Sequence, residues 1–107
     1  MAVKEVSVQE LKRRMDAGEK FQLLDVREPW EVAIAHLPGS THIPLGQLSA
    51  RLSELPADSD TIVMCHSGGR SRRATEMLVA RGFDRAANLT GGIDAWADEI
   101  DPDMPTY

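Results

Sequence analysis

The chain has one cysteine, Cys65, and the residues around it are of the types that activate a thiol. An apolar, β-prone run, Thr61–Met64, leads into it, and a short loop with two glycines and an arginine follows, His66–Arg70. Ser71–Ala80 then has the pattern of a helix. Backbone N–H groups in a loop that wraps a helix N-terminus point inward, and the helix dipole adds partial positive charge there. We therefore expect a lowered pKa for Cys65 and a thiolate that can act as a nucleophile.

The alternative is that Cys65 is a small buried hydrophobe, which is common for a lone cysteine. The loop argues against this, because Gly68 and Gly69 expose backbone and add nothing to packing. Arg70 adds a positive charge that favours the thiolate.

The hydroxyls of Ser67 and Ser71 are candidate hydrogen-bond donors to a sulfur on the cysteine, although Ser71 is equally suited to be the helix N-cap. For His66 the expected contribution is its backbone amide. A cradle that already lowers the thiol pKa needs no general base, and the imidazole is then free to point to solvent.

The elements that must position this loop alternate between strands and helices. Predicted strands are Val3–Val6, Phe21–Val26, Thr41–Ile43, Thr61–Met64 and Arg85–Leu89; predicted helices follow the capping box Ser7–Glu10 as far as Gly18, then cover Trp30–Ala35, Leu45–Leu55, Ser71–Arg81 and Ile93–Glu99. The alternation predicts an α/β fold with a central parallel sheet of about five strands and helices on both faces. Ligands bind such sheets outside the carboxyl ends of the strands, where Cys65 lies beside Asp25–Arg27 and Leu89–Gly92.

Composition limits the classes of function. At 107 residues, 42% apolar and 27% charged, we expect one domain over 1–107, with a core of about 3–100 and a tail of 101–107. The net charge of −5 argues against nonspecific nucleic-acid binding. There is no membrane-length apolar run, and Met1–Val6 lacks the shape of a signal peptide. A single thiol suits a reducing compartment, so we expect a cytoplasmic protein. Three scattered histidines and one cysteine predict no metal site.

Four segments in order resemble the rhodanese family of sulfurtransferases. They are Leu24–Glu28 followed by Trp30-Glu31; Ala35–Pro44, similar to the family's Gly-His-Ile-Pro-Gly-Ala segment; the loop Cys65–Ser71; and Leu89–Gly92 with Trp96. The match covers nearly the whole chain. Ala35 stands where glycine is usual and Ser40 where alanine is usual, and both are small residues outside the cysteine loop.

The resemblance implies that the Cys65 thiolate takes the outer sulfur of a donor such as thiosulfate and carries it as a persulfide. A thiophilic acceptor, which is cyanide, a thiol or a protein, then removes that sulfur. His66, Ser67, Gly68, Gly69, Arg70 and Ser71 would bind the transferred sulfur, and no metal or organic cofactor is required. The alternative in another class is a sulfur-relay module that delivers persulfide sulfur to a partner protein.

Loop length bears on the reaction class. Rhodanese loops resemble Cys-x4-Arg, as in Cys65 to Arg70, whereas related cysteine phosphatases use Cys-x5-Arg. Phosphatase or arsenate reductase is therefore the lesser interpretation. The basic loop, followed by Arg72 and Arg73, favours thiosulfate over mercaptopyruvate, although a solvated helix face also accounts for Arg73.

Residues outside the loop have structural alternatives. Asp25 and Arg27 either orient the loop or substrate, or form an ion pair or turn cap, for example Arg27 with Glu28 or Glu31; we favour the structural role. The side chains expected to serve turns and packing are His36, His42, Trp30 and Trp96.

The tail, Ile100–Tyr107, resembles the ending of rhodanese domains fused to ubiquitin-like activating enzymes, which pass sulfur to a small carrier protein. That resemblance points to a protein acceptor. The alternative is a tail that only packs against the sheet edge. Neither the oligomeric state nor the physiological donor follows from the sequence.

Overall fold

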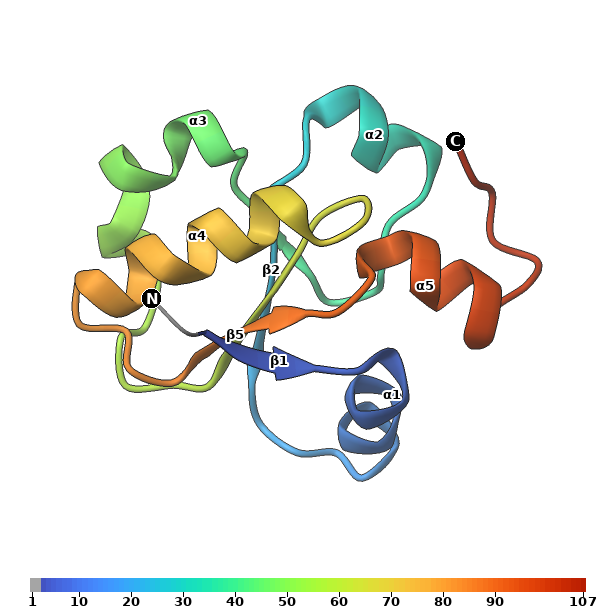
Figure 1. Ribbon diagram of the computed structural model, residues 1–107, viewed down its shortest axis with the longest axis horizontal. Helices are drawn as coiled ribbons and strands as arrows, with labels where there is room; N and C mark the ends of the chain where they lie inside the picture. The colour runs from blue at the N-terminus through green and yellow to red at the C-terminus, as the bar shows by residue number, and fades with distance from the viewer. Residues whose placement is uncertain (1–2) are drawn as a thin grey trace.

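The computed structural model describes residues 3–107. Met1 and Ala2, which the sequence analysis placed in the predicted domain 1–107 and in a segment without signal-peptide character, lie outside the described residues. At the centre is a five-stranded sheet in the order β1-β5-β4-β2-β3, with every pairing parallel (Figure 1). The strands are β1 (Lys4–Val6), β2 (Gln22–Asp25), β3 (Thr41–His42), β4 (Thr61–Met64) and β5 (Ala86–Leu89). The predicted parallel α/β sheet is confirmed, with strand ends within two residues of those expected.

Helices cover both faces of the sheet, as predicted. They are α1 (Val8–Asp16), α2 (Pro29–Ile34), α3 (Leu45–Leu48), the 3-10 helix η1 (Ser49–Glu54), α4 (Gly69–Ala80) and α5 (Gly92–Glu99). The cluster that contains Leu48 and Leu78 lies beneath α3 and α4, and the cluster that contains Leu11 and Trp96 lies beneath α1 and α5. Figure 1 shows α3 and α4 on one side of the strands and α1 on the other. None of these helices has the length and apolar character that a membrane crossing requires.

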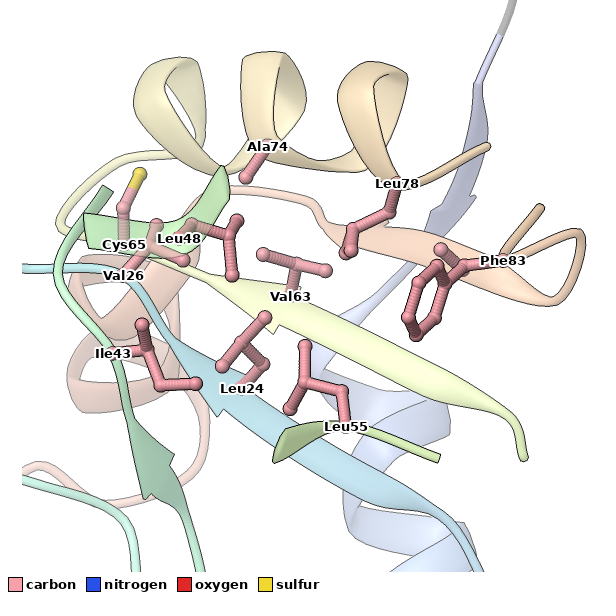
Figure 2. Packing of buried hydrophobic residues seen from close by; sticks show 11 residues of the cluster. Leu24, Val26, Ile43, Leu48, Leu55, Val63, Cys65, Ala74, Leu78 and Phe83 are labelled. Carbon is pink, nitrogen blue, oxygen red and sulfur yellow. The ribbon is translucent and has the colours of Figure 1, made fainter. Parts of the chain in front are cut away.

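The core fixes the strand that leads to the cysteine. All four residues of β4 are buried, because the strand lies between β2 and β5 and beneath helices on both faces. Val63 and Leu78 pack together on the α4 side with no exposed surface, and each such side chain contributes about 1.5–3 kcal/mol on burial. Figure 2 shows Cys65 at the end of this cluster, with its sulfur directed to the side covered by α4. The thiol therefore sits on a rigid support.

Local sequence signals set most helix ends. Ser7 caps α1 by accepting a hydrogen bond from the Glu10 amide at 3.1 Å. The reciprocal half of the predicted capping box is absent from the described contacts, because the Glu10 carboxylate instead pairs with Arg13. Gly18 and Gly82 follow their helices with φ of 67° and 96°, the left-handed conformation that glycine adopts without strain.

The single predicted helix over Leu45–Leu55 is wrong. The chain forms one α-turn, α3, and then η1, with non-helical dihedrals at Arg51 (φ −118°, ψ 17°). The leucine spacing fits this arrangement too, since side chains three residues apart lie on one face of a 3-10 helix. Leu48 and Leu55 are both buried, so the apolar pattern predicted the buried face and not the helix type.

The parallel register brings the carboxyl ends of the strands to one edge. Asp25 pairs with Met64 between β2 and β4, and Asn88 pairs with Val63 between β5 and β4. The residues that follow these strands therefore surround Cys65, as the sequence predicts for an open parallel sheet.

Candidate active site

Cys65 lies directly after β4 and is 1% exposed. Its Sγ accepts a hydrogen bond from the Gly68 amide at 3.1 Å and contacts the Ser71 hydroxyl at 3.3 Å. Gly68 has φ of 113°, a conformation that side-chain-bearing residues rarely adopt, and this turn aims its N–H at the sulfur. The loop thus closes around the thiol as a bowl of donors.

These contacts decide the ionisation of the thiol. Burial alone raises the pKa of Cys65, but hydrogen bonds from the Ser71 hydroxyl and from the backbone amides of Ser71, Gly68 and Ser67 outweigh it. The pKa therefore lies below its ordinary value, which favours the thiolate. Three of these four donors are backbone amides that the loop holds in place, so the thiolate needs no neighbouring general base.

Ser71 is not the helix N-cap. Helix α4 begins at Gly69 with Gly68 as its N-cap, so Ser71 lies in the first turn with its hydroxyl turned inward. The Ser71 hydroxyl therefore contacts the sulfur, the other alternative that the sequence left open, whereas the side chain of Ser67 is exposed and this residue acts on the sulfur through its backbone amide. Gly69 has space around its Cα for a side chain, so only Gly68 of this pair needs to be glycine.

Asn88 at the end of β5 is a neighbour of the site that the sequence analysis missed. Its Oδ1 accepts from the Ser71 hydroxyl at 2.5 Å, and its Nδ2 donates to the Gly68 carbonyl at 3.3 Å and to the Glu5 carboxylate. Asn88 thereby ties two loop residues to the sheet. A polar residue in the otherwise apolar run Ala86–Leu89 was the available signal.

The start of α5 holds the other side of the loop. The amides of Ile93 and Asp94 donate to the carbonyls of Cys65 and His66 at 2.9 and 3.0 Å. At Gly92 the backbone has φ of +60°, and a Cβ there would lie 2.5 Å from the Cys65 carbonyl oxygen. Glycine is required at this position because the two backbones approach so closely.

Arg70 does not present a free guanidinium to the cysteine. Its two terminal nitrogens donate to the two oxygens of Glu31 at 2.6 and 2.8 Å, a bidentate ion pair. Glu31 is 3% exposed and Arg70 35% exposed. Hydrogen bonds from Arg70 hold the pKa of Glu31 down to about 2, and those same bonds raise the pKa of Arg70. The expectation of a basic loop therefore needs correction, since the charge at its end is paired.

The tail residue Tyr107 reaches into this network. Its hydroxyl donates to Glu31 Oε2 at 2.6 Å and accepts from Arg27 at 3.1 Å. Its ring stacks on the His66 ring, with centroids 4.1 Å apart and planes 14° apart. The imidazole of His66 thus packs against the tail rather than pointing freely to solvent. Figure 1 shows the C-terminal end returning toward α2.

Asp25 and Arg27 form a buried ion pair, neither of them exposed. Arg27 donates to both Asp25 oxygens and to the carbonyls of Glu31 and Ala35. Burial opposes the charge of Arg27, but its bonds to Asp25 and Tyr107 raise its pKa. The ion-pair prediction is correct in kind and wrong in partner, because neither Glu28 nor the Glu31 carboxylate pairs with Arg27.

The two tryptophans differ. Trp96 is 6% exposed within the core, as predicted, but Trp30 is 61% exposed and packs edge-on against Tyr107, at 5.6 Å between centroids. Trp30 therefore packs against the tail at the surface and is not part of the core. His42 has a structural contact, with Nε2 2.6 Å from the Arg27 carbonyl.

Glu31 and Tyr107 are two further side chains near the loop that sequence reasoning did not assign to the site. Glu31 lies 39 residues from Arg70, and Tyr107 lies 76 residues from Glu31, so neither contact is local in sequence. Within residues 3–107, no three His, Cys, Asp or Glu side chains are grouped so that they could hold a metal ion.

Comparison with known proteins agrees with this architecture. The family model described as "Rhodanese-like domain" matches residues 7–99. The chain belongs to the rhodanese-like family. A sulfurtransferase of Allochromatium vinosum is 38% identical over 89% of this chain and 89% of its own length. The putative sulfur carrier protein YrkF of Bacillus subtilis is 35% identical over 94% of this chain and 54% of its own length.

The solved structures give the same result. A rhodanese-like domain protein from Staphylococcus aureus is 31% identical, with a TM-score of 0.84 over 91% of this chain and 94% of that one. This chain spans about half or less of the length of several curated relatives that it matches. The rhodanese-like relatives therefore include both single domains and larger proteins.

Proposed function

We propose that this chain moves a sulfane sulfur from thiosulfate or a similar donor to a thiophilic acceptor through a persulfide on Cys65. The observation that carries the proposal is the bowl around Sγ, in which Gly68 and Ser71 contact the sulfur and lower its pKa. Membership of a family with sulfurtransferase and sulfur-carrier relatives supports it.

With thiosulfate, the Cys65 thiolate attacks the outer sulfur. A new S–S bond forms to Cys65, the bond between the two sulfurs of thiosulfate breaks, and its electron pair leaves with sulfite. The product is a persulfide anion, which keeps the single negative charge that the thiolate brought. The added sulfur can accept hydrogen bonds from the groups that donate to Sγ, which are the amides of Gly68 and Ser67 and the hydroxyl of Ser71. The net charge of the loop stays the same.

An acceptor then attacks the outer sulfur of the persulfide and restores the Cys65 thiolate. Cyanide gives thiocyanate by this step, and a thiol gives a new persulfide. Two half-reactions with one covalent intermediate make a ping-pong scheme. The site needs a reducing environment to keep Cys65 free, so we propose a cytoplasmic location.

The second candidate is a sulfur-relay module that delivers the persulfide sulfur to a partner protein. An exposed aromatic residue beside the site favours it. Trp30, on α2, lies against Tyr107 of the tail, and Ile34 of the same helix is also exposed. The resemblance to a putative sulfur carrier protein supports the same function. We regard a phosphatase or arsenate reductase as the lesser alternative, because four residues separate Cys65 from Arg70, whereas the related cysteine phosphatases have five at this place.

The test loads the protein with thiosulfate and follows discharge to cyanide and to a reduced protein dithiol. Many cycles of thiocyanate release per Cys65 support a sulfurtransferase that turns over small molecules. Slow cyanide turnover together with rapid discharge to the dithiol supports the relay. Hydrolysis of an aryl phosphate with no sulfur loading would overturn both.

A further inference from the structure

The guanidinium of Arg70 is the group in the loop best shaped to bind an oxyanion, and a side chain of this chain already occupies it. Two parallel N–H···O contacts of 2.6 and 2.8 Å join Arg70 to Glu31. The same fork-to-carboxylate geometry would serve the sulfonate end of thiosulfate or the carboxylate of mercaptopyruvate. An anionic donor therefore has to displace Glu31 before it can use Arg70.

Other contacts keep Glu31 in that position. Its Oε2 also accepts from the Tyr107 hydroxyl at 2.6 Å, and its Oε1 accepts from the Glu28 amide at 3.0 Å. Arg27 donates both to that Tyr107 hydroxyl and to the Glu31 carbonyl. Glu31 is nearly inaccessible, so its charge cannot turn to water while the network is intact.

The surroundings reinforce this barrier. The groove beside the loop, between Ser67 and Tyr107, is lined by the carboxylates of Asp94, Asp98 and Glu99. Their field opposes the approach of a dianion, although solvent screens it more than it screens the buried pair. The Arg70–Glu31 pair and the acidic groove thus both disfavour an anionic donor, and the solvent-screened groove has the weaker effect.

We propose that Glu31 is the specificity-determining residue of this site, acting through Arg70 to disfavour oxyanionic sulfur donors, and that Tyr107 locks it in place. The favoured donor class is a persulfide without an oxyanion near its reacting end. The inference rests on the proposed Cys65 chemistry. With an alkyl persulfide in its protonated form, a new S–S bond forms between the Cys65 sulfur and the outer sulfur, which keeps its proton. The S–S bond of the donor breaks, and its electron pair leaves with the alkyl thiolate.

The experiment compares two donors across four proteins: wild type, Glu31→Gln, Tyr107→Phe and the control Asp94→Asn. Glu31→Gln and Asp94→Asn remove the same charge near the same loop, but only Glu31 contacts Arg70. Thiosulfate-to-cyanide kinetics give kcat and KM, and mass spectrometry gives the loading rate from an alkyl persulfide whose alkyl group carries no charge. Thermal unfolding checks that each variant is folded.

Glu31→Gln is expected to raise kcat/KM for thiosulfate roughly tenfold through a lower KM, because a bidentate charged competitor is removed. Loading from the alkyl persulfide is expected to change by less than about twofold, since that donor does not use the fork. Tyr107→Phe should lower the thiosulfate KM in the same direction by a smaller factor. Asp94→Asn should have an effect of less than about threefold, as expected for an exposed, screened charge.

An unchanged or higher thiosulfate KM in Glu31→Gln would overturn the inference. An equal rise in sulfur transfer from both donors, or an equal rise in Asp94→Asn, would also overturn it. Either result would assign the effect to the net charge near the loop and not to the contact with Arg70. If no variant takes sulfur from either donor, the proposed function itself fails and the inference fails with it. Loading by the persulfide with no donor discrimination leaves the proposed function standing and removes only the role of Glu31.

Discussion

Replacing Ser71 by alanine removes the one side-chain hydroxyl that contacts the Cys65 sulfur. The Ser71 backbone amide and the Gly68 amide remain, because neither depends on the side chain. The expected result is a higher pKa for Cys65, since burial then opposes the thiolate with one fewer hydrogen bond against it.

The size of the shift follows from the contacts. A hydrogen bond to a charged group contributes about 1.5–3 kcal/mol, which changes the equilibrium between thiol and thiolate about tenfold or more. The 3.3 Å contact to Sγ shares its single hydroxyl hydrogen with Asn88 Oδ1, which lies at 2.5 Å. We therefore expect the lower end of that range, about a tenfold change in this equilibrium.

Alkylation of Cys65 by iodoacetamide as a function of pH is the assay. Well below the pKa, the thiolate fraction in Ser71→Ala falls about tenfold, while its intrinsic nucleophilicity rises about threefold, so the rate constant falls about threefold. The control is Ser67→Ala, which makes the same chemical change in the same loop at an exposed side chain. A midpoint in Ser71→Ala that is unchanged or lower, or an equal shift in Ser67→Ala, would refute the reasoning.

Three further predictions concern stability. Folding lowers the pKa of Glu31 from 4.5 to about 2, so the stability that ionised Glu31 contributes is present above pH 4.5 and is lost as the pH falls to about 2. Over that range, urea denaturation of wild type should show a loss of up to about 3 kcal/mol of unfolding free energy that Glu31→Gln does not show. Parallel pH curves for the two proteins would contradict this. Gly92→Ala should cost at least about 2 kcal/mol through its clash with the Cys65 carbonyl, whereas Gly69→Ala should stabilise by about 0.4–1 kcal/mol; equal effects in thermal melts would exclude this explanation. Arg27→Met should cost about 3–5 kcal/mol because it leaves Asp25 buried without its partner, and a cost below about 1 kcal/mol by urea denaturation would be inconsistent with that pairing.

Much of the cysteine loop could be predicted from the sequence because its determinants are local. An apolar run, two glycines and a helical pattern are consecutive, and they predict a strand, a tight loop and a helix without reference to the rest of the chain. The same locality explains why two alternatives stayed open at Ser71 and why the prediction at Leu45–Leu55 was wrong. A serine near a helix start fits the N-cap or the first turn equally well, and the leucine spacing does not distinguish an α-helix from a 3-10 helix.

The partners of the loop were not predictable in the same way. Glu31 and Tyr107 reach Arg70 and His66 only because α2 and the tail meet at one edge of the sheet. The expected basic rim counted the charge of Arg70 without the carboxylate that folding brings to it. Asn88 was likewise overlooked. Its position in an apolar strand indicated burial, and a buried side-chain amide requires hydrogen-bond partners.

The central claim is that Cys65 carries the transferred sulfur, and intact-mass measurement tests it most directly. Wild type and Cys65→Ser are incubated separately with thiosulfate and with an alkyl persulfide, then treated with cyanide. We predict a gain of one sulfur atom on wild type with at least one donor, lost with stoichiometric release of thiocyanate, and no gain on Cys65→Ser. A folded, reduced wild type that gains no sulfur from either donor, or a Cys65→Ser variant that gains as much, would contradict the account.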